Sequence, residues 1–312
     1  MINVFINRKV VNTAWGGGNK IVQGFFKFGK QCGMNVSNVL DENTDIALII
    51  NPHYDNQTQM PGINEILNYK YRHNKNLKII NRINEKNLGR IPQENRFDHV
   101  YIEMSKYCDG NIFVSNWLKK YYFDKDWHSK NNIVIHNGVD KEIFKNYKIK
   151  LSDKNNKINI ITHHWSNNIG KGFKYYEAIE KMCEENPEKF TFTYMGRHRN
   201  NFKTAKVIGP FHGKKIGEEL SKYDLYISAS QYESGPNHVL EALACGLPVI
   251  IIDKSGGGIE MVKTQDNFFK DEKDLIDKIL NTKYSTEIAY KTKGMKEFVR
   301  EYCNYFKKVI NG

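Results

Sequence analysis

Two glutamates with the spacing of a functional pair lie in the segment Gln231–Ile250, QYESGPNHVLEALACGLPVI. Glu233 and Glu241 are separated by the seven residues SGPNHVL. Two carboxylates can serve as general acid and base, hold a metal ion, or accept hydrogen bonds from a ligand's hydroxyl groups. The elements that carry the two side chains decide between these roles.

A short helix is predicted over Pro236–Cys245, between the strands Asp224–Ser230 and Pro248–Asp253. Pro236 suits the first helical position, and Ser234 or Gly235 can cap the start. Gly246 and the following proline end the helix. Glu233 therefore lies in the loop before the helix, and Glu241 lies about 7 Å along its axis.

A helix that begins after a parallel strand offers free N–H groups and the positive end of its dipole to an anion. An inward side chain at Glu241 leans back toward that end. A carboxylate beside a phosphate would repel it, so Glu241 suits neutral ribose hydroxyls, and Glu233 suits a second polyol such as a sugar. The alternative is that Glu241 is a solvated helix residue and Glu233 an ordinary loop acid.

Apolar strands and helical patterns alternate along the whole chain, which predicts an α/β protein of two doubly wound halves. The strands lack polar alternation, as expected for parallel strands covered on both faces. Ligands should then bind at the carboxyl ends of the strands, in a cleft between the halves. The predicted strands are Ile2–Ile6, Ile46–Ile50, Leu77–Ile83, Asn111–Ser115, Asn132–Gly138, Ile158–His164, Phe190–Gly196, Lys206–Phe211, Asp224–Ser230 and Pro248–Asp253.

A polar stretch, Phe144–Lys157, has the composition of an interdomain linker. We predict an N-terminal domain over 1–148, a second domain over 149–294 and an amphipathic helix over 295–312. The apolar face of that helix should pack against the body of the protein, back on the N-terminal domain. A membrane-surface helix is the alternative, because its other face is basic.

The chain has 312 residues and a formal net charge of +12, which favours acidic partners. A lysine-rich soluble surface accounts for this charge at least as well as a nucleic-acid-binding face. The five cysteines form no CxxC motif, and no apolar run reaches the roughly 20 residues of a membrane-spanning helix. We expect a cytoplasmic protein, with a peripheral membrane contact left open.

Several motifs resemble, in order, those of the retaining GT-B glycosyltransferases of family 4. ESGPNHVLEALACGLPVI is similar to their E-x7-E segment. The match is strongest from Ile158 to Val262. The other matching stretches are WGGGNK (Trp15–Lys20), NGVDKEIF (Asn137–Phe144), GKGF (Gly170–Phe173), MGR (Met195–Arg197) and SGGGIEMV (Ser255–Val262).

This resemblance implies a GT-B fold with two Rossmann-like domains, of which the second binds a nucleotide sugar. Glu241 would hold the ribose and Glu233 the transferred sugar, while Lys171 would pair with the diphosphate. A solvated lysine at a helix start is disfavoured, because without a bound anion its charge opposes the helix dipole. The backbone around the helix start would face the sugar and diphosphate: Pro236, Asn237, His238 and Val239.

The N-terminal domain would contribute a glycine loop whose amides approach phosphate closely. Its residues are Gly16, Gly17 and Gly18, and a plain flexible turn is the alternative. WGGGN is not the GxGxxG of nicotinamide-binding folds, and no Walker A motif is present.

The chain departs from the family pattern at Ser166, where many members carry a diphosphate-binding arginine. Arg82 or Arg197 could supply that cation instead. Pro236 also replaces a common glycine. Some members have an N-terminal-domain histidine near the reacting sugar, and the positions to consider here are His53, Asn81, Arg82 and His99.

A metal site is not expected. Asp124 and Asp126 form a DxD sequence, but they lie at the polar end of a helix rather than after an apolar strand. His163 and His164 are adjacent, which is not zinc-ligand spacing. We expect them to line the cleft.

The resemblance implies transfer of a sugar from a nucleotide-sugar donor to a hydroxyl of a glycan, lipid-linked or other acceptor. The anomeric configuration would be retained, without metal or other cofactor. Catalysis would rest on Glu233 and Lys171 and on stabilising the leaving diphosphate. The alternatives are a non-catalytic nucleotide-sugar binder, which Ser166 keeps open, and a basic nucleic-acid-binding protein, which lacks a supporting motif.

Overall fold

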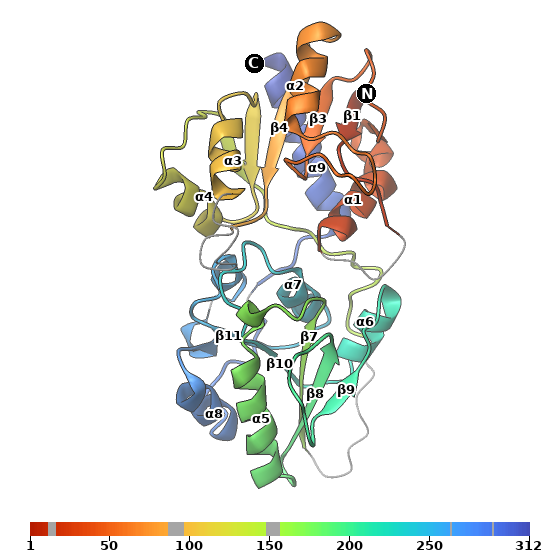
Figure 1. Cartoon of the computed structure of the whole chain (residues 1–312). Helices are drawn as coiled ribbons and strands as arrows, with labels where there is room; N and C mark the ends of the chain where they lie inside the picture. The colour runs from red at the N-terminus through yellow and green to blue at the C-terminus, as the bar shows by residue number, and fades with distance from the viewer. Residues whose placement is uncertain (12–16, 87–96, 148–156, 263, 289) are drawn as a thin grey trace. The chain divides into compact units, whose positions relative to one another are not determined.

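Two parallel six-stranded sheets form the framework of the computed structural model, which describes residues 1–11, 17–86, 97–147, 157–262, 264–288 and 290–312 (Figure 1). The chain divides into two compact units. Unit 1 holds the described residues of 1–138 and 293–312, and unit 2 holds those of 139–292. The predicted α/β class with parallel sheets is confirmed.

The sheet of unit 1 has the strand order β2-β1-β3-β4-β5-β6. Its strands are β1 (Ile2–Ile6), β2 (Met34–Ser37), β3 (Ile46–Ile49), β4 (Lys78–Ile83), β5 (Gly110–Phe113) and β6 (Asn132–Val134). Its helices are α1 (Gly17–Phe28), α2 (Ile63–Arg72), α3 (Phe97–Met104), α4 (Asn116–Phe123) and α9 (Met295–Asn311).

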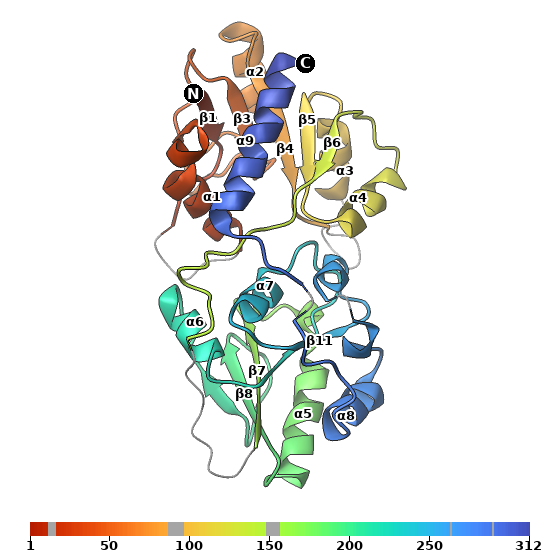
Figure 2. The same cartoon turned by 180° about the vertical axis from the view of Figure 1, so that it is seen from behind.

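The C-terminal helix α9 belongs to unit 1, where it packs beside α1 on one face of the sheet (Figure 2). The ring of Tyr302 meets Phe25 of α1 edge-on, with the ring centroids 5.1 Å apart. Phe298 is fully buried in the same apolar cluster. The expected packing of the helix on the N-terminal domain is confirmed, and its apolar face is covered by protein.

Arg82 links three elements of unit 1 although it is only 2% exposed. Its Nε donates to the hydroxyl of Tyr302 on α9 at 3.1 Å, and its Nη2 donates to Oδ1 of Asn137 after β6 at 2.8 Å. A buried guanidinium is costly unless it is hydrogen-bonded. These bonds tie β4 to α9 across the face of the sheet.

The sheet of unit 2 has the order β12-β11-β10-β7-β8-β9. Its strands are β7 (Ile158–His164), β8 (Phe190–Gly196), β9 (Lys206–Ile208), β10 (Leu225–Ser228), β11 (Val249–Ile252) and β12 (Phe268–Phe269). Its helices are α5 (Phe173–Glu185), α6 (Lys214–Leu220), α7 (Asn237–Ala244) and α8 (Glu272–Leu280). Apolar side chains of α5 and α8 cover one face, and those of α6 and α7 cover the other.

The edge strands differ most from the predictions. β2 and β12 were not predicted, because each is short and pairs with a single neighbour. β9 ends at Ile208, before the predicted Phe211, since Gly209 has a left-handed φ of 78° and Pro210 lacks an N–H for the ladder. β6 likewise ends at Val134 rather than Gly138.

No helix in the described part of the chain is both long and apolar enough to cross a membrane.

Truncating the buried ring of α9 should destabilise unit 1. Phe298→Ala removes a fully buried side chain from the α1–α9 cluster and should lower the free energy of unfolding by about 3 kcal/mol or more. Lys307→Ala on the exposed face of α9 is the matched control and should change it by less than about 0.5 kcal/mol. Chemical denaturation measures both values, and an equal effect of the two changes would contradict the packing described.

Candidate functional site

The candidate site lies at the carboxyl ends of β7 and β10 in unit 2. From β7 the chain continues through β8 and β9 on one side of the sheet, and then returns to β10 on the other side. The loops after β7 and β10 therefore diverge at a topological switch point, where open α/β sheets bind their ligands. Lys171 follows β7, and Glu233 follows β10.

Main-chain hydrogen bonds hold the loops at this edge together. The N–H of Gln231 donates to the carbonyl of Gly170 at 2.8 Å. The N–H of Glu233 donates to the carbonyl of Ser255 after β11 at 2.8 Å, and Gly257 N–H donates back to Glu233 at 2.7 Å. The backbone of Glu233 is therefore fixed between its neighbours.

Lys171 and Glu233 form a close ion pair, with Nζ 2.5 Å from Oε1. Their side chains are 10% and 13% exposed, so solvent screens the pair weakly. Lys171 ends a short 3-10 turn, Ile169–Lys171, and Gly172 after it has a left-handed φ of 73°. A side chain at Gly172 would clash with the backbone of Ala229, so this position requires glycine.

Glu241 lies within α7 and is only 3% exposed. Its Oε2 is 3.0 Å from Nε2 of His163, near the end of β7. The neighbouring helix residues Val239, Leu240 and Ala242 are buried in an apolar cluster. The alternative of a solvated Glu241 is therefore wrong.

His163, His164 and His238 pack around the same edge. The ring centroids of His164 and His238 are 5.0 Å apart, and His238 Nε2 is 3.1 Å from Ser228 Oγ. Burial lowers the pKa of His238 to about 3. Burial, followed by the positive charge of Lys171, also holds the pKa of His164 well below its usual range. Both rings are thus neutral near pH 7.

His164 faces the protein core. Its Nε2 is 2.7 Å from the hydroxyl of Tyr176 and 3.2 Å from Oγ1 of Thr162. Tyr176 in turn accepts the N–H of Ala229 at 3.0 Å. His164 therefore forms part of the core beneath the sheet edge, which differs from the expectation that it lines the cleft.

The start of α7 differs in detail from the prediction. The helix begins at Asn237, and Pro236 occupies the N-cap position without a side-chain cap. The predicted cap by Ser234 or Gly235 is wrong, because Pro236 takes that position, and Oγ of Ser234 has no hydrogen-bond partner among the described residues. The hydroxyls of Ser230 and Ser255 are also buried without a partner in the described part of the chain. The side chain of Val239 lies in the core, so only its backbone can face a ligand.

Arg197 brings a cation to the same sheet edge, close to the position where an arginine was expected. Its guanidinium lies 4.1 Å from the ring centroid of Trp165, the residue before Ser166. The main-chain N–H of Arg197 donates to the main-chain carbonyl of His164 at 3.1 Å. Arg197 thus stays at the end of β8, next to the loop that carries Ser166.

The remaining predicted residues that the structure describes belong to unit 1. Gly17 and Gly18 begin α1, and Gly16 lies outside the described residues. The guanidinium of Arg8, after β1, packs over Gly18: a Cβ at Gly18 would lie 3.0 Å from Nη1 of Arg8. His53 is exposed after β3, and Arg82 makes the buried bonds described above.

Two further features bear on the metal alternatives. Asp124 and Asp126 are exposed at the end of α4 in unit 1. Within the described residues, no group of three or more histidine, cysteine, aspartate or glutamate side chains is arranged to hold a metal ion.

Sequence reasoning missed the role of His163 as the partner of Glu241. The usable signal was a pair of polar histidines at the end of the otherwise apolar strand INIITHH. A buried carboxylate needs a hydrogen-bond donor, and the adjacent strand is the natural place to look for one. His163 and Glu241 are 78 positions apart in the sequence, so no local pattern indicates their contact.

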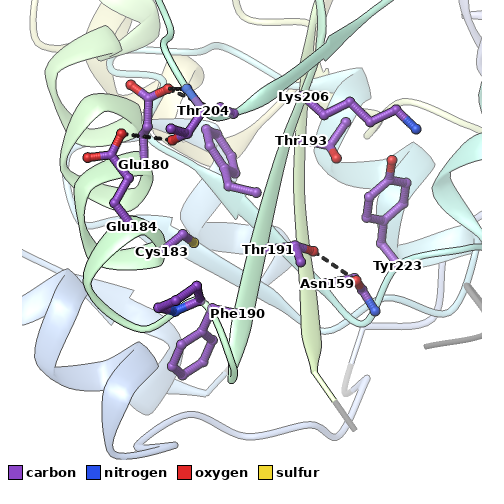
Figure 3. Close-up of a pocket in the computed structure, with 13 residues that line it drawn as sticks. Asn159, Glu180, Cys183, Glu184, Phe190, Thr191, Thr193, Thr204, Lys206 and Tyr223 are labelled. Atoms are coloured by element: carbon purple, nitrogen blue, oxygen red, sulfur yellow. Dashed lines mark hydrogen bonds between the residues drawn. The ribbon is translucent and has the colours of Figure 1, made fainter. Parts of the chain in front are cut away.

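A hollow of about 760 Å³ lies elsewhere in unit 2, between α5 and the start of β8 and β9 (Figure 3). Its walls include Asn159, Phe190 and Lys206, which stand at the amino ends of their strands. Glu180 closes one side by accepting the backbone N–H groups of Thr204 and its two neighbours at 2.7–2.9 Å. The hollow is therefore at the opposite end of the sheet from Lys171 and Glu233.

Comparison with known proteins supports a glycosyltransferase fold. Residues 174–302 match the family model described as glycosyl transferases group 1. Sucrose-phosphate synthase of Thermosynechococcus elongatus superposes with a TM-score of 0.65 at 12% identity, over 100% of this chain and 97% of that one. HepE of Anabaena, in complex with UDP and glucose, gives 0.63 at 14% identity, over 100% and 97%.

A third structure, the pneumococcal O-GlcNAc transferase GtfA with UDP and GlcNAc, gives a TM-score of 0.62 at 13% identity. It aligns over 88% of this chain and 58% of its own. These likenesses establish the fold: the protein has the two-sheet α/β architecture of GT-B glycosyltransferases.

One curated sequence also matches, at 27% identity over 202 residues: the DNA-directed RNA polymerase subunit beta' of Oedogonium cardiacum. The match covers 61% of this chain but only 10% of that subunit. Because it involves a tenth of a much longer protein, it assigns no activity to this chain.

The neutral His164 should make stability depend on pH. Its folded-state pKa is depressed, so the unfolded chain binds the proton more readily and stability falls as pH drops below about 6.5. The contribution is at most about 1.4 kcal/mol per pH unit. His164→Gln should remove that component of the slope between pH 7 and 5 in chemical denaturation.

The exposed His212→Gln variant is the matched control for this pH experiment, since it makes the same chemical change in the same unit. A wild-type slope retained in His164→Gln would contradict a neutral, buried His164.

Proposed function

We propose that this protein is a retaining glycosyltransferase of the family-4 type, which transfers a sugar from a nucleotide-sugar donor to an acceptor hydroxyl without a metal ion. The observation that carries the proposal is the placement of two paired carboxylates, Glu233 and Glu241, around the start of α7 at a topological switch point. The family match over 174–302 includes both glutamates, while Lys171 lies just before it.

The roles of the side chains follow from their charge and position. Glu241 accepts hydrogen bonds from the ribose hydroxyls, and Glu233 accepts them from the transferred sugar. Backbone N–H groups at the start of α7 and the ammonium of Lys171 face the diphosphate. Arg197 is the candidate for the second cation, in place of the arginine that Ser166 replaces.

The chemical task is to stabilise the nucleoside diphosphate as it leaves. Charge develops on that group in the transition state, and a preorganised cation in a site screened from water lowers the barrier. Glu233 holds the ammonium of Lys171 in place. Donor binding would bring an anion to the lysine and sugar hydroxyls to the glutamate, so each partner gains a ligand of suitable chemistry.

The proposed acceptor is a hydroxyl group, carried by a glycan, a lipid-linked molecule or another molecule. The net charge of +12 favours an acceptor that carries negative charge or lies at an anionic surface. HepE and GtfA were both solved with UDP, which makes UDP-sugars the first donors to test.

The function is tested by a thermal-shift screen with UDP-, GDP-, ADP- and CMP-sugars, followed by donor turnover with the sugar that stabilises the protein most. A glycosyltransferase should be stabilised by one base class and should release its nucleoside diphosphate. Stabilisation by none of the four donors would contradict the proposal.

A non-catalytic nucleotide-sugar binder is the second candidate, and Ser166 is the observation that favours it. Loss of the diphosphate arginine would weaken leaving-group stabilisation more than ground-state binding. That candidate predicts a thermal shift with a nucleotide sugar but neither hydrolysis nor transfer.

Removing the Lys171 ammonium should abolish most of the turnover. Lys171→Ala takes away the cation assigned to the diphosphate, and kcat/KM for the donor should fall about 100-fold. Lys174→Ala, an exposed lysine on the first turn of α5, is the matched control and should retain activity. Equal activity of the two variants would remove Lys171 from the site.

Glu233→Gln should act in opposite directions on product binding and on turnover. Without the carboxylate, Lys171 loses its ion-pair partner Glu233, so affinity for the free nucleoside diphosphate should rise several-fold. Turnover should fall, because the sugar loses its hydrogen-bond acceptor. Calorimetric titration and a turnover assay measure the two effects, and weaker binding of the diphosphate would count against the proposed division of roles.

A further inference from the structure

His163 and Glu241 form a buried contact between a strand and a helix that are far apart in sequence. Nε2 of His163 is 3.0 Å from Oε2 of Glu241, and the two residues are 8% and 3% exposed. We infer that His163 is a positioning residue, which orients the carboxylate of Glu241 toward the ribose hydroxyls of the donor. The inference rests on the proposed function, because it acts through the ribose role of Glu241.

The imidazole of His163 is itself held in place. The main-chain N–H of His163 lies 3.2 Å from the hydroxyl of Tyr226 on β10, and that hydroxyl lies 3.3 Å from the carbonyl oxygen of His163, so the backbone that carries the ring is fixed to β10. The ring meets Tyr226 at 73° and His238 at 90°, with centroids 5.5 and 6.1 Å away. The ring is thus packed between side chains of β10 and α7, and such packing limits the motion of a positioning group.

Glu241 needs such a partner because of its surroundings. It is on an eight-residue helix whose neighbouring side chains lie in an apolar cluster. A carboxylate there is costly without hydrogen bonds. An N–H of His163 that donates to Oε2 supplies one and orients the group, which can then accept hydrogen bonds from ribose. Both the Nε2-protonated neutral ring and the imidazolium can make this bond.

The contact could instead serve only to attach α7 to the sheet. The two explanations differ in which nucleotides should bind more weakly when His163 is replaced. A purely structural contact affects all nucleotides equally. A contact that orients Glu241 matters only for a nucleotide that has ribose hydroxyls.

The deciding experiment compares a ribonucleotide with one that lacks those hydroxyls. The probes are the tightest-binding of UDP, GDP, ADP and CMP, and its 2′,3′-dideoxy counterpart. Calorimetric titration gives the dissociation constants for the wild type, His163→Leu, His163→Gln and Glu241→Gln. The loss of a hydrogen bond to a charged group is expected to raise the dissociation constant about tenfold.

We expect His163→Leu to weaken ribonucleotide binding about tenfold and to leave dideoxynucleotide binding unchanged. His163→Gln should bind the ribonucleotide nearly as tightly as the wild type, because the glutamine amide can also donate a hydrogen bond to Glu241. An equal loss for both nucleotides, or no loss for either, would overturn the positioning role of His163.

Failure of the proposed function has a different signature. A wild type that binds both nucleotides equally, with Glu241→Gln behaving like the wild type, would show that Glu241 does not hold ribose. If the wild type and His163→Leu both bind the ribonucleotide more tightly than the dideoxynucleotide, and by the same factor, the role of His163 alone would be overturned.

A ligand-free measurement keeps the inference testable if His163→Leu folds poorly. The imidazole NMR signals of His163 in the unliganded protein should shift on Glu241→Gln, since the carboxylate is the acceptor at 3.0 Å. Unchanged signals would overturn the contact on which the inference is built.

Discussion

The candidate site depends on the cost of removing two carboxylates from water. Glu233 and Glu241 are both largely buried, and an isolated buried carboxylate is strongly unfavourable. Lys171 offsets this cost for Glu233 by direct ion pairing, and His163 offsets it for Glu241 by hydrogen bonding. Each pair joins the edge of β7 to the segment after β10, so the requirement for partners also fixes the geometry of the site.

The sheet order makes these partnerships available. Because β7 and β10 are neighbours although sixty residues separate them, their carboxyl ends present residues distant in sequence to the same small region. Short main-chain bonds between the loops after β7, β10 and β11 then hold the carboxylates in place. Ser230, Ser234 and Ser255 add buried hydroxyls around the start of α7, which suits a ligand rich in oxygen. Unit 1 has a similar switch in strand order, because β1 lies between β2 and β3. The helix α1, which follows β1, begins with Gly17 and Gly18.

Two buried polar arrangements serve stability rather than ligand binding. Arg82 ties β4 to α9 through Tyr302, which secures the C-terminal helix on the unit formed by the beginning of the chain. Glu180 fixes a loop of unit 2 by accepting consecutive backbone N–H groups, and these bonds, which oppose the effect of burial, lower the pKa of its carboxyl. Both cases follow the same rule as the site, since a buried charge persists where hydrogen-bond or ion-pair partners meet it.

The sequence by itself determined the alternation of strands and helices, the parallel sheets and the packing of α9. Long apolar strands and a strongly amphipathic helix carry these signals locally. The sequence also placed Glu233 before α7 and Glu241 within it, because proline and glycine mark the helix ends. Short edge strands such as β2 and β12 escaped prediction, since they contain too few residues to establish a pattern.

Only the tertiary structure decided which side chains meet. It paired Lys171 with Glu233 and His163 with Glu241, directed His164 into the core, and placed Arg197 against Trp165 beside Ser166. These contacts join residues from different strands, and no local pattern records them. Their physical cause is the sheet order together with the desolvation of charge: the order brings strand ends together, and burial then requires each charged group to find a partner among them.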